Sequence, residues 1–302
     1  MKKNIVFYFE YNWEKQELDT PFEWCSENIE TRQLCLIKEL LSDDTELYLV
    51  RHTKNHIKEN VFIPEYIFKN WAWESVKIEK IHAHLCLGYK IPKTVTNIFP
   101  SLNKHMRDKR VVEKIFPKYS IISIECQNYD DIIKNFSRIQ TTYKVLKPYN
   151  GSQWKWVFIT ENIPQKNEFD VSFFPYLLQE FIDTSQWFWW YTWYYDLRII
   201  LISGKIVWKI LRQPKEWKYI ANVAQEWILR DLEDIPLPAQ IQKIISEVDD
   251  YFEKISQHRY YSIDFWIDTI WVVKIFEMNS YPGLGIPRVA KALWKYIMKH
   301  MI

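Results

Sequence analysis

Two short runs in which apolar and polar residues alternate, Ser262–Phe265 and Val272–Ser280, constrain the fold of this chain more than any other feature. Such alternation is typical of half-buried β-strands, and the short turn between the runs makes them a hairpin. Glu277 and Asn279 lie two residues apart, so they point to the same face of one strand, and the hairpin places Asp264 near them. The sequence therefore predicts a sheet with oxygen-bearing side chains clustered on one face.

Carboxylates that cluster on a half-buried face are unfavourable unless a cation compensates their charge. The ligand atoms of Asp264, Glu277 and Asn279 are all oxygens, with no His or Cys, so the cluster predicts Mg²⁺ or Mn²⁺ with phosphate oxygens completing an octahedron. The alternative is a solvent-facing acidic hairpin that binds nothing. The tight turn Asn279–Gly285 that follows favours the metal site.

A second polar surface is predicted on an earlier pair of strands. Asp196 and Arg198 lie two apart and share one face, and the turn at Ser203–Gly204 brings the strand that leads to Arg212 alongside. Asn222 follows in the phrase Ala-Asn-Val-Ala-Gln. The alternative is an exposed sheet face with an ordinary ion pair.

A third stretch predicts a flap over phosphates. A strand ends at Lys147, and a loop that contains Gly151 and Ser152 leads into the next strand without the spacing of a P-loop. If Trp154 and Trp156 stand at glycine positions, the backbone N–H groups of this loop can close over phosphate oxygens, and Lys147 adds a positive charge. The alternative is a basic surface hairpin.

The glycine content supports that reading of the tryptophans. The chain has 302 residues, 16 Trp and only 5 Gly. An average content of ~7% would give roughly 21 glycines, which is the number that the two residue types make together. We therefore advance the hypothesis that many of these tryptophans are glycines encoded by UGA. Its rival is an aromatic-rich protein with few turns.

Charge and composition exclude several classes of protein. Lys and Arg number 40 against 38 Asp and Glu, a net charge of +2 that does not predict nucleic acid as a partner. The four cysteines are far apart and form no C-x-x-C pair, which favours free thiols. There is no run of ~18 apolar residues and no signal-peptide core, so we expect a cytoplasmic protein without a membrane segment.

The order of secondary structure predicts an α/β (α+β) protein of two domains. The N-terminal domain, residues 1–105, combines strands at Ile5–Phe9 and Leu47–Val50 with a helix near residues 27–41. Residues 106–302 are rich in short strands with hairpin signals, and two helices interrupt or end them, near residues 239–255 and 287–298.

Taken in order, six phrases of this sequence resemble those of the ATP-grasp superfamily, and most of all its glutathione-synthetase and ribosomal-protein glutamate-ligase (RimK-type) branch. They are K-P-Y-N-G-S-Q-W-K-W-V, Q-E-F-I, D-L-R-I-I, R-Q-P, A-N-V-A-Q and D-F-W-I-D…E-M-N-S-Y-P-G-L-G. The resemblance runs from Asp108 to the C-terminus. It implies an ATP-grasp fold with a Rossmann-like pre-ATP-grasp domain, a lid subdomain at about residues 106–178 and a C-terminal metal- and ATP-binding subdomain at 179–302.

The resemblance also implies a role for each matching residue. Lys109 and Lys147 would contact ATP phosphates, with Gly151 and Ser152 in the flap above them. The inter-domain hinge that receives adenine and ribose would consist of Gln179, Glu180, Phe181 and Ile182. Metal ions would be held by Asp264, Glu277 and Asn279, with Glu277 bridging two of them. Arg212 and Asn222 would bind the transferring phosphoryl group or the acyl-phosphate, and Arg198 would support Asp196 and the sheet face.

The implied reaction is a two-step ligation. A substrate carboxylate attacks the γ-phosphate of ATP to give an acyl-phosphate, and an amine then displaces phosphate with formation of an amide bond. The partners would be ATP with Mg²⁺ or Mn²⁺ and small-molecule or peptide substrates, without nucleic acid or membrane, and a homo-oligomer is compatible with this reading. One alternative is an ATP-binding protein without ligase turnover. Another is a single-stranded nucleic-acid binder that uses the aromatic segment Trp187–Tyr195.

Departures from the family's pattern fall almost wholly at tryptophans, several of them at positions where relatives tend to carry glycine. This is a second line of support for the UGA hypothesis, independent of the residue counts. The positions are Trp154, Trp156, Trp189, Trp190, Trp193, Trp208, Trp217, Trp227, Trp266 and Trp271.

Overall fold

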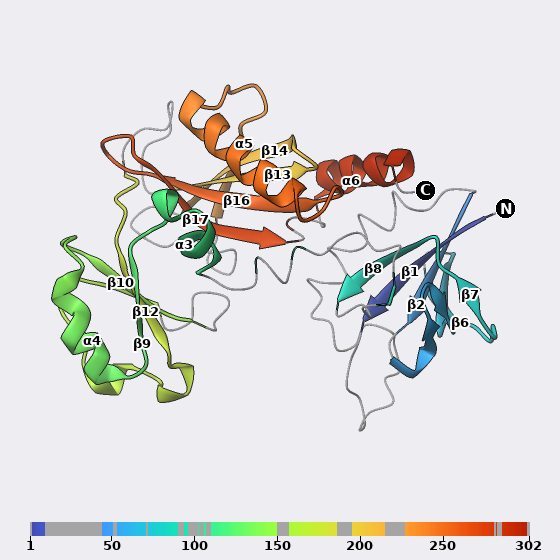
Figure 1. The fold of residues 1–302 in the computed structure, drawn as a ribbon, viewed down its shortest axis with the longest axis horizontal. Helices are drawn as coiled ribbons and strands as arrows, with labels where there is room; N and C mark the ends of the chain where they lie inside the picture. The colour runs from blue at the N-terminus through green and yellow to red at the C-terminus, as the bar shows by residue number, and fades with distance from the viewer. Residues whose placement is uncertain are drawn as a thin grey trace. The chain divides into compact units, whose positions relative to one another are not determined.

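The computed structural model describes residues 2–9, 44–50, 53–70, 72–89, 94–95, 102, 106, 110–149, 157–185, 195–214, 227–280, 282 and 286–300 (Figure 1). Two compact units make up the chain. The first comprises Met1–Ser101, Ser256–Tyr260 and Tyr281–Ile302, and the second comprises Leu102–Ile255 and Tyr261–Ser280. No helix of the described residues is both long enough and apolar enough to span a bilayer.

The first unit contains a five-stranded sheet in the order β6-β5-β2-β1-β8. Its centre is parallel, since β1 pairs in parallel with both β2 and β8, while β5 and β6 are antiparallel additions at one edge. The strands are β1 (Lys3–Phe9), β2 (Thr45–Val50), β5 (Tyr66–Lys69), β6 (Ala72–Ser75) and β8 (Leu85–Tyr89). The strands predicted at Ile5–Phe9 and Leu47–Val50 are confirmed, whereas the helix predicted near residues 27–41 lies outside the described residues.

Smaller elements complete this unit. A three-stranded sheet in the order β3-β4-β7 follows a short 3-10 helix, and the C-terminal helix α6 buries the apolar side of an amphipathic sequence. The predicted C-terminal helix is confirmed. The bounds are η1 (Thr53–Asn55), β3 (His56–Lys58), β4 (Val61–Phe62), β7 (Ile81–His82) and α6 (Pro287–His300).

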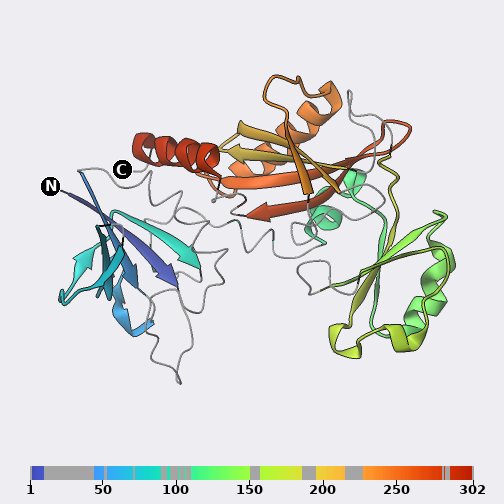
Figure 2. The same cartoon turned by 180° about the vertical axis from the view of Figure 1, so that it is seen from behind.

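The second unit contains an antiparallel four-stranded sheet in the order β11-β10-β12-β9, which we call the lid sheet (Figures 1 and 2). Helix α4 packs on it through Ile132, in a core shared with Leu146 and Leu178. The hairpin predicted around the flap loop is confirmed, because β10 pairs antiparallel with β11. The elements are β9 (Ser123–Cys126), α4 (Tyr129–Asn135), η3 (Phe136–Arg138), β10 (Lys144–Pro148), β11 (Phe158–Thr160), η4 (Lys166–Glu168), η5 (Val171–Phe173) and β12 (Tyr176–Glu180).

The same unit contains a five-stranded sheet in the order β15-β14-β13-β16-β17, which we call the site sheet. Both predicted hairpins are present, β13 with β14 and β16 with β17. The turn between β13 and β14 uses positive φ at Ser203 (42°) and Gly204 (81°), the backbone that a tight hairpin turn requires. The strands are β13 (Asp196–Ile202), β14 (Lys205–Pro214), β15 (Trp227–Asp231), β16 (Tyr260–Ile267) and β17 (Val273–Ser280).

One face of the site sheet forms the largest core of this unit. Leu197, Ile263 and Ile275 point into it, and α5 covers it with Ile241 and Val248 (Figure 1). Helix α5 confirms the helix predicted near residues 239–255, and α3 with η2 packs on the same core through apolar side chains. The bounds are α3 (Val111–Ile115), η2 (Pro117–Tyr119) and α5 (Ala239–Glu253). Because strand side chains alternate, the polar members of these strands lie on the opposite face.

Two of the tryptophans suspected to be glycines are poorly accommodated. Trp271, in the turn between β16 and β17, has φ of 65°, the left-handed region that a bulky residue disfavours. Trp208 on β14 has a buried indole N–H that finds no hydrogen-bond partner among the described residues. Both observations support glycine at these positions.

We predict that Trp271→Gly raises the free energy of unfolding by about 1 kcal/mol, because glycine adopts positive φ without steric cost. The indole is 54% exposed, so little burial is lost. Thermal unfolding of purified variants measures the effect. Trp271→Ala is the control, because it removes the indole but keeps the Cβ that clashes, and it should not stabilise the protein. A lower midpoint for the glycine variant would contradict the prediction.

Candidate functional site

The polar face of the site sheet gathers the side chains that the sequence singled out. The register pairs Asp196 with Arg212 across β13 and β14, and Asp264 with Glu277 across β16 and β17. Asn279 lies two residues beyond Glu277 on the same face. The structure thus brings together five of the predicted residues from four strands.

Arg212 is the centre of a buried ion network. Its guanidinium donates in a bidentate manner to Asp196, from Nε to Oδ1 at 2.5 Å and from Nη2 to Oδ2 at 2.6 Å. The same Nη2 donates to Asp264 Oδ2 at 2.8 Å. The residues Asp196, Arg212 and Asp264 are 4%, 8% and 0% exposed. An exposed face with an ordinary ion pair is therefore excluded as the reading of this surface.

The carboxylate that Arg198 contacts differs from the one that the sequence predicted. Arg198 was expected to support Asp196 and the sheet face. It does support the face, but its guanidinium hydrogen-bonds to Asp264 and not to Asp196, from Nε to Oδ1 at 2.7 Å and from Nη2 to Oδ2 at 2.5 Å. The reason is the strand order: β13 lies between β14 and β16, so Arg198 has a second carboxylate within reach on a strand that is distant in sequence. Both arginines therefore converge on Asp264.

The pKa values of the two buried aspartates are shifted in opposite directions. For Asp264, burial alone would raise the pKa, but the Arg198 and Arg212 guanidiniums outweigh burial and hold the pKa below its ordinary value. For Asp196, burial raises the pKa against the pull of Arg212, and repulsion from Asp264 adds to the increase. Asp264 is thus the carboxylate whose negative charge the network stabilises.

Three carboxylates lie on this face, those of Asp196, Asp264 and Glu277, and the two arginines hydrogen-bond to Asp196 and Asp264. Glu277 and Asn279 are partly exposed, and Asn279 Nδ2 lies 3.5 Å from Asp264 Oδ2. Carboxylate and amide oxygens are the ligands that Mg²⁺ or Mn²⁺ prefers. Glu277 and Asn279 would offer such oxygens, whereas both oxygens of Asp264 accept from guanidinium groups in this structure. No three His, Cys, Asp or Glu side chains cluster as metal ligands in the part of the chain that is described.

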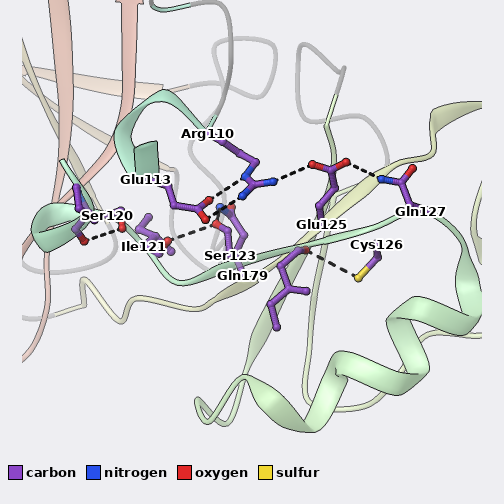
Figure 3. Close-up of polar contacts among 11 residues, drawn as sticks. Arg110, Glu113, Ser120, Ile121, Ser123, Glu125, Cys126, Gln127 and Gln179 are labelled. Carbon is purple, nitrogen blue, oxygen red and sulfur yellow. Dashed lines mark hydrogen bonds and ion pairs between the residues drawn. The ribbon is translucent and has the colours of Figure 1, made fainter. Parts of the chain in front are cut away.

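The predicted hinge runs from the end of β12 and contacts the start of β9. Gln179 Nε2 donates to Ser123 Oγ in the lid sheet (Figure 3). Glu180 exchanges hydrogen bonds with the backbone of Ile122. Phe181 N donates to Thr141 Oγ1 at 3.3 Å, and Ile182 is buried. The hinge is thus anchored to the lid sheet at successive residues.

Lys147, on β10, contacts the polar face of the site sheet. Its Nζ lies 4.5 Å from the ring centroid of Phe276. The Phe276 ring also forms a parallel stack with Trp266, at 4.0 Å between centroids and 11° between planes. A β-bulge makes this arrangement: Asp264 pairs with Glu277 but Phe265 pairs with Ile275, so Phe276 is the extra residue. Sequence reasoning missed this contact, because alternation alone does not reveal a bulge.

Arg110 is a further residue that the sequence analysis did not single out. It donates from Nε and Nη2 to the Glu113 carboxylate at 2.9 and 3.0 Å, and from Nη1 to Glu125 at 3.0 Å (Figure 3). Glu113 lies in α3 and Glu125 in β9, so Arg110 ties the helix to the lid sheet. Its place beside Lys109 in the phrase Asp-Lys-Arg was the available signal.

Four predicted site residues lie outside the described part of the chain: Lys109, Gly151, Ser152 and Asn222. Their roles stay predictions. The same holds for the aromatic segment proposed to stack bases, which is described only at Tyr195.

Comparison with known proteins gives no match to a family model and no match among curated proteins. Solved structures do match over nearly the whole chain. The VanG D-Ala:D-Ser ligase from Enterococcus faecalis has a TM-score of 0.64 at 10% identity, covering 100% of both chains. D-alanyl-alanine synthetase A from Vibrio cholerae has a TM-score of 0.63 at 10% identity, covering 99% of this chain and 97% of the other.

A RiPP-associated ATP-grasp ligase from Chryseobacterium gregarium, solved with ADP and a leader and core peptide, has a TM-score of 0.57 at 12% identity over 98% and 97% of the two chains. At these identities the likeness defines the fold. The chain has the mixed helix-and-sheet fold of ATP-grasp ligases, which confirms the predicted fold class; the Rossmann-like character of the N-terminal domain stays a prediction.

Proposed function

We propose that this protein is an ATP-dependent carboxylate–amine ligase of the glutathione-synthetase and RimK-type branch, which forms an amide bond through an acyl-phosphate. The observation that carries the proposal is the polar face of the site sheet. There, Arg198, Arg212 and Asp264 form a buried network beside Glu277, with Lys147 close by. Phosphoryl transfer needs positioned charge more than a covalent nucleophile, and this face supplies it.

The metal ligands in this proposal are Asp264, Glu277 and Asn279. Mg²⁺ bound there would neutralise charge on the phosphate oxygens. Arg198 and Arg212 hold Asp264 ionised and fix its orientation, as its lowered pKa and its hydrogen bonds indicate. Asp196 in turn holds Arg212 in one orientation.

The remaining residues bind the nucleotide and exclude water. Lys147 and Lys109 contact phosphates, the hinge from Gln179 to Ile182 receives the base and ribose, and the flap with Gly151 and Ser152 closes over the phosphates. Arg212 and Asn222 bind the phosphoryl group in transfer. Water exclusion by the flap protects the acyl-phosphate from hydrolysis.

The substrate class follows from the neighbours in structure. One is a D-Ala:D-Ser ligase and another was solved with a leader and core peptide, so we propose an amino acid or peptide as the carboxylate and amine. We further propose the domain bounds that the resemblance implies: residues 1–105 before the ATP-grasp domain, about 106–178 as the lid and 179–302 as the metal- and ATP-binding subdomain. We place the protein in the cytoplasm, where the buried thiols of Cys86 and Cys126 stay reduced.

ADP release tests this function. The protein is made with tryptophan and, separately, with glycine at the suspected positions, and each form is incubated with Mg²⁺, ATP and a panel of amino acids and short peptides. We expect substrate-dependent ADP release from the glycine form, because two indoles in the flap obstruct closure. Nucleotide binding without turnover by either form, across the panel, would favour the alternative of an ATP-binding protein that is not a ligase.

A further inference from the structure

One lysine joins the site sheet to both chain segments that connect with the lid sheet. Lys274, on β17, donates from Nζ to the backbone oxygen of Ser120 at 2.9 Å, and the same Nζ lies 4.0 Å from Glu180 Oε1. Ser120 lies just before β9, and Glu180 is the last residue of β12. Lys274 therefore contacts the chain where it enters the lid sheet and where it leaves.

The contacts of Glu180 fix the direction of its carboxylate. Its Oε1 accepts from Ile122 N at 2.9 Å, while its own N–H donates to Ile122 O at 3.1 Å. Lys274 approaches the same oxygen, Oε1, and the two side chains are only 13% and 22% exposed. Among the described residues, these contacts leave Oε2 as the acceptor that Glu180 offers to a ligand.

We propose that Lys274 is a positioning residue for base recognition. By holding Oε1 of Glu180, it aims Oε2 at the base-binding side of the hinge, where this oxygen accepts a hydrogen bond from the exocyclic amine of a 6-aminopurine. An ionised carboxylate has no proton to donate, so it disfavours a 6-oxopurine, which presents an acceptor at that place. This inference rests on the proposed function, because that proposal assigns the base to the hinge.

A purely structural role for Lys274 predicts a different result. If the lysine only joins the two segments, its loss weakens the binding of every nucleotide equally and lowers the unfolding temperature. If it orients the Glu180 carboxylate, its loss selectively weakens the binding of the nucleotide with a 6-aminopurine base. The ratio of two dissociation constants therefore distinguishes the roles.

The experiment measures the dissociation constants of ATP and inosine triphosphate for the full-length chain and its variants by titration calorimetry. We expect Lys274→Met to raise the dissociation constant of ATP about tenfold, which is the effect of losing one charge-assisted hydrogen bond. The dissociation constant of inosine triphosphate should rise less than about twofold. Lys274→Arg, which keeps the charge, should restore selectivity. Lys118→Met is the matched control, because Lys118 is 60% exposed and pairs with Glu247 away from the hinge.

A double-mutant cycle with Glu180→Gln adds a readout that a fold defect does not reproduce. Once Glu180 has lost its charge, replacing Lys274 should change ATP affinity by less than about twofold. The inference is overturned if the unsubstituted protein binds ATP and inosine triphosphate equally, if Lys274→Met keeps full selectivity, or if it weakens both nucleotides equally. Failure of both the tryptophan and the glycine form to bind either nucleotide would instead overturn the proposed function, and the inference with it.

Discussion

Glu277→Gln should reduce Mg²⁺-dependent ADP release by about 10²- to 10³-fold, the range expected when a group that stabilises transition-state charge is lost. Asp196 and Asp264 accept hydrogen bonds from the two arginines, whereas Glu277 would offer its carboxylate to the metal. The amide has the same shape but no charge. The fold should be unaffected, because Glu277 is partly exposed and the buried network remains complete.

Three measurements separate this effect from general damage. The rate of ADP release and its dependence on Mg²⁺ concentration are determined for the variant, and thermal unfolding checks its stability. Asp250→Asn is the matched control, since Asp250 is an exposed carboxylate on α5 outside the polar face. The measurements use the glycine form. Full turnover by its Glu277→Gln variant, at the Mg²⁺ concentration that suffices for the glycine form itself, would contradict the assignment of Glu277 to the metal.

The sequence predicted the hairpins of the site sheet because alternation and turn residues are local signals. Asp264, Glu277 and Asn279 therefore converge as expected, and the strand that leads to Arg212 lies alongside that of Asp196 as expected. The local signal is also why these predictions needed no knowledge of strand order.

Contacts between strands that are distant in sequence were not predictable in this way. Arg198 was assigned to Asp196, its neighbour on the same strand, whereas it contacts Asp264 because β13 lies beside β16. The contact of Lys147 with Phe276 depends on a β-bulge that adds one residue, and no residue pattern marks it. The contacts of Lys274 were unpredictable for the same reason, since its partners Ser120 and Glu180 lie in the segments that connect with the lid sheet.

The network around Arg212 predicts the largest change in stability. Arg212→Met should lower the free energy of unfolding by about 3–5 kcal/mol, because it leaves two buried carboxylates with less compensation. Asp196 loses its bidentate partner, and Asp264 loses one of the two guanidinium groups that donate to it. Urea unfolding of the variant measures the change.

Arg198→Met should lower the free energy of unfolding less, because Arg198 is the more exposed arginine and Asp264 then still has Arg212. The stability of Arg212→Lys should fall between that of the unsubstituted protein and that of Arg212→Met. A lysine keeps the charge but cannot form the two parallel hydrogen bonds to Asp196. Replacing Asp196 by Asn in the Arg212→Met background should recover part of the loss, because an uncompensated buried charge is removed. A loss below about 1 kcal/mol for Arg212→Met, the range of exposed ion pairs, would mean that the pair behaves as a surface contact despite its burial.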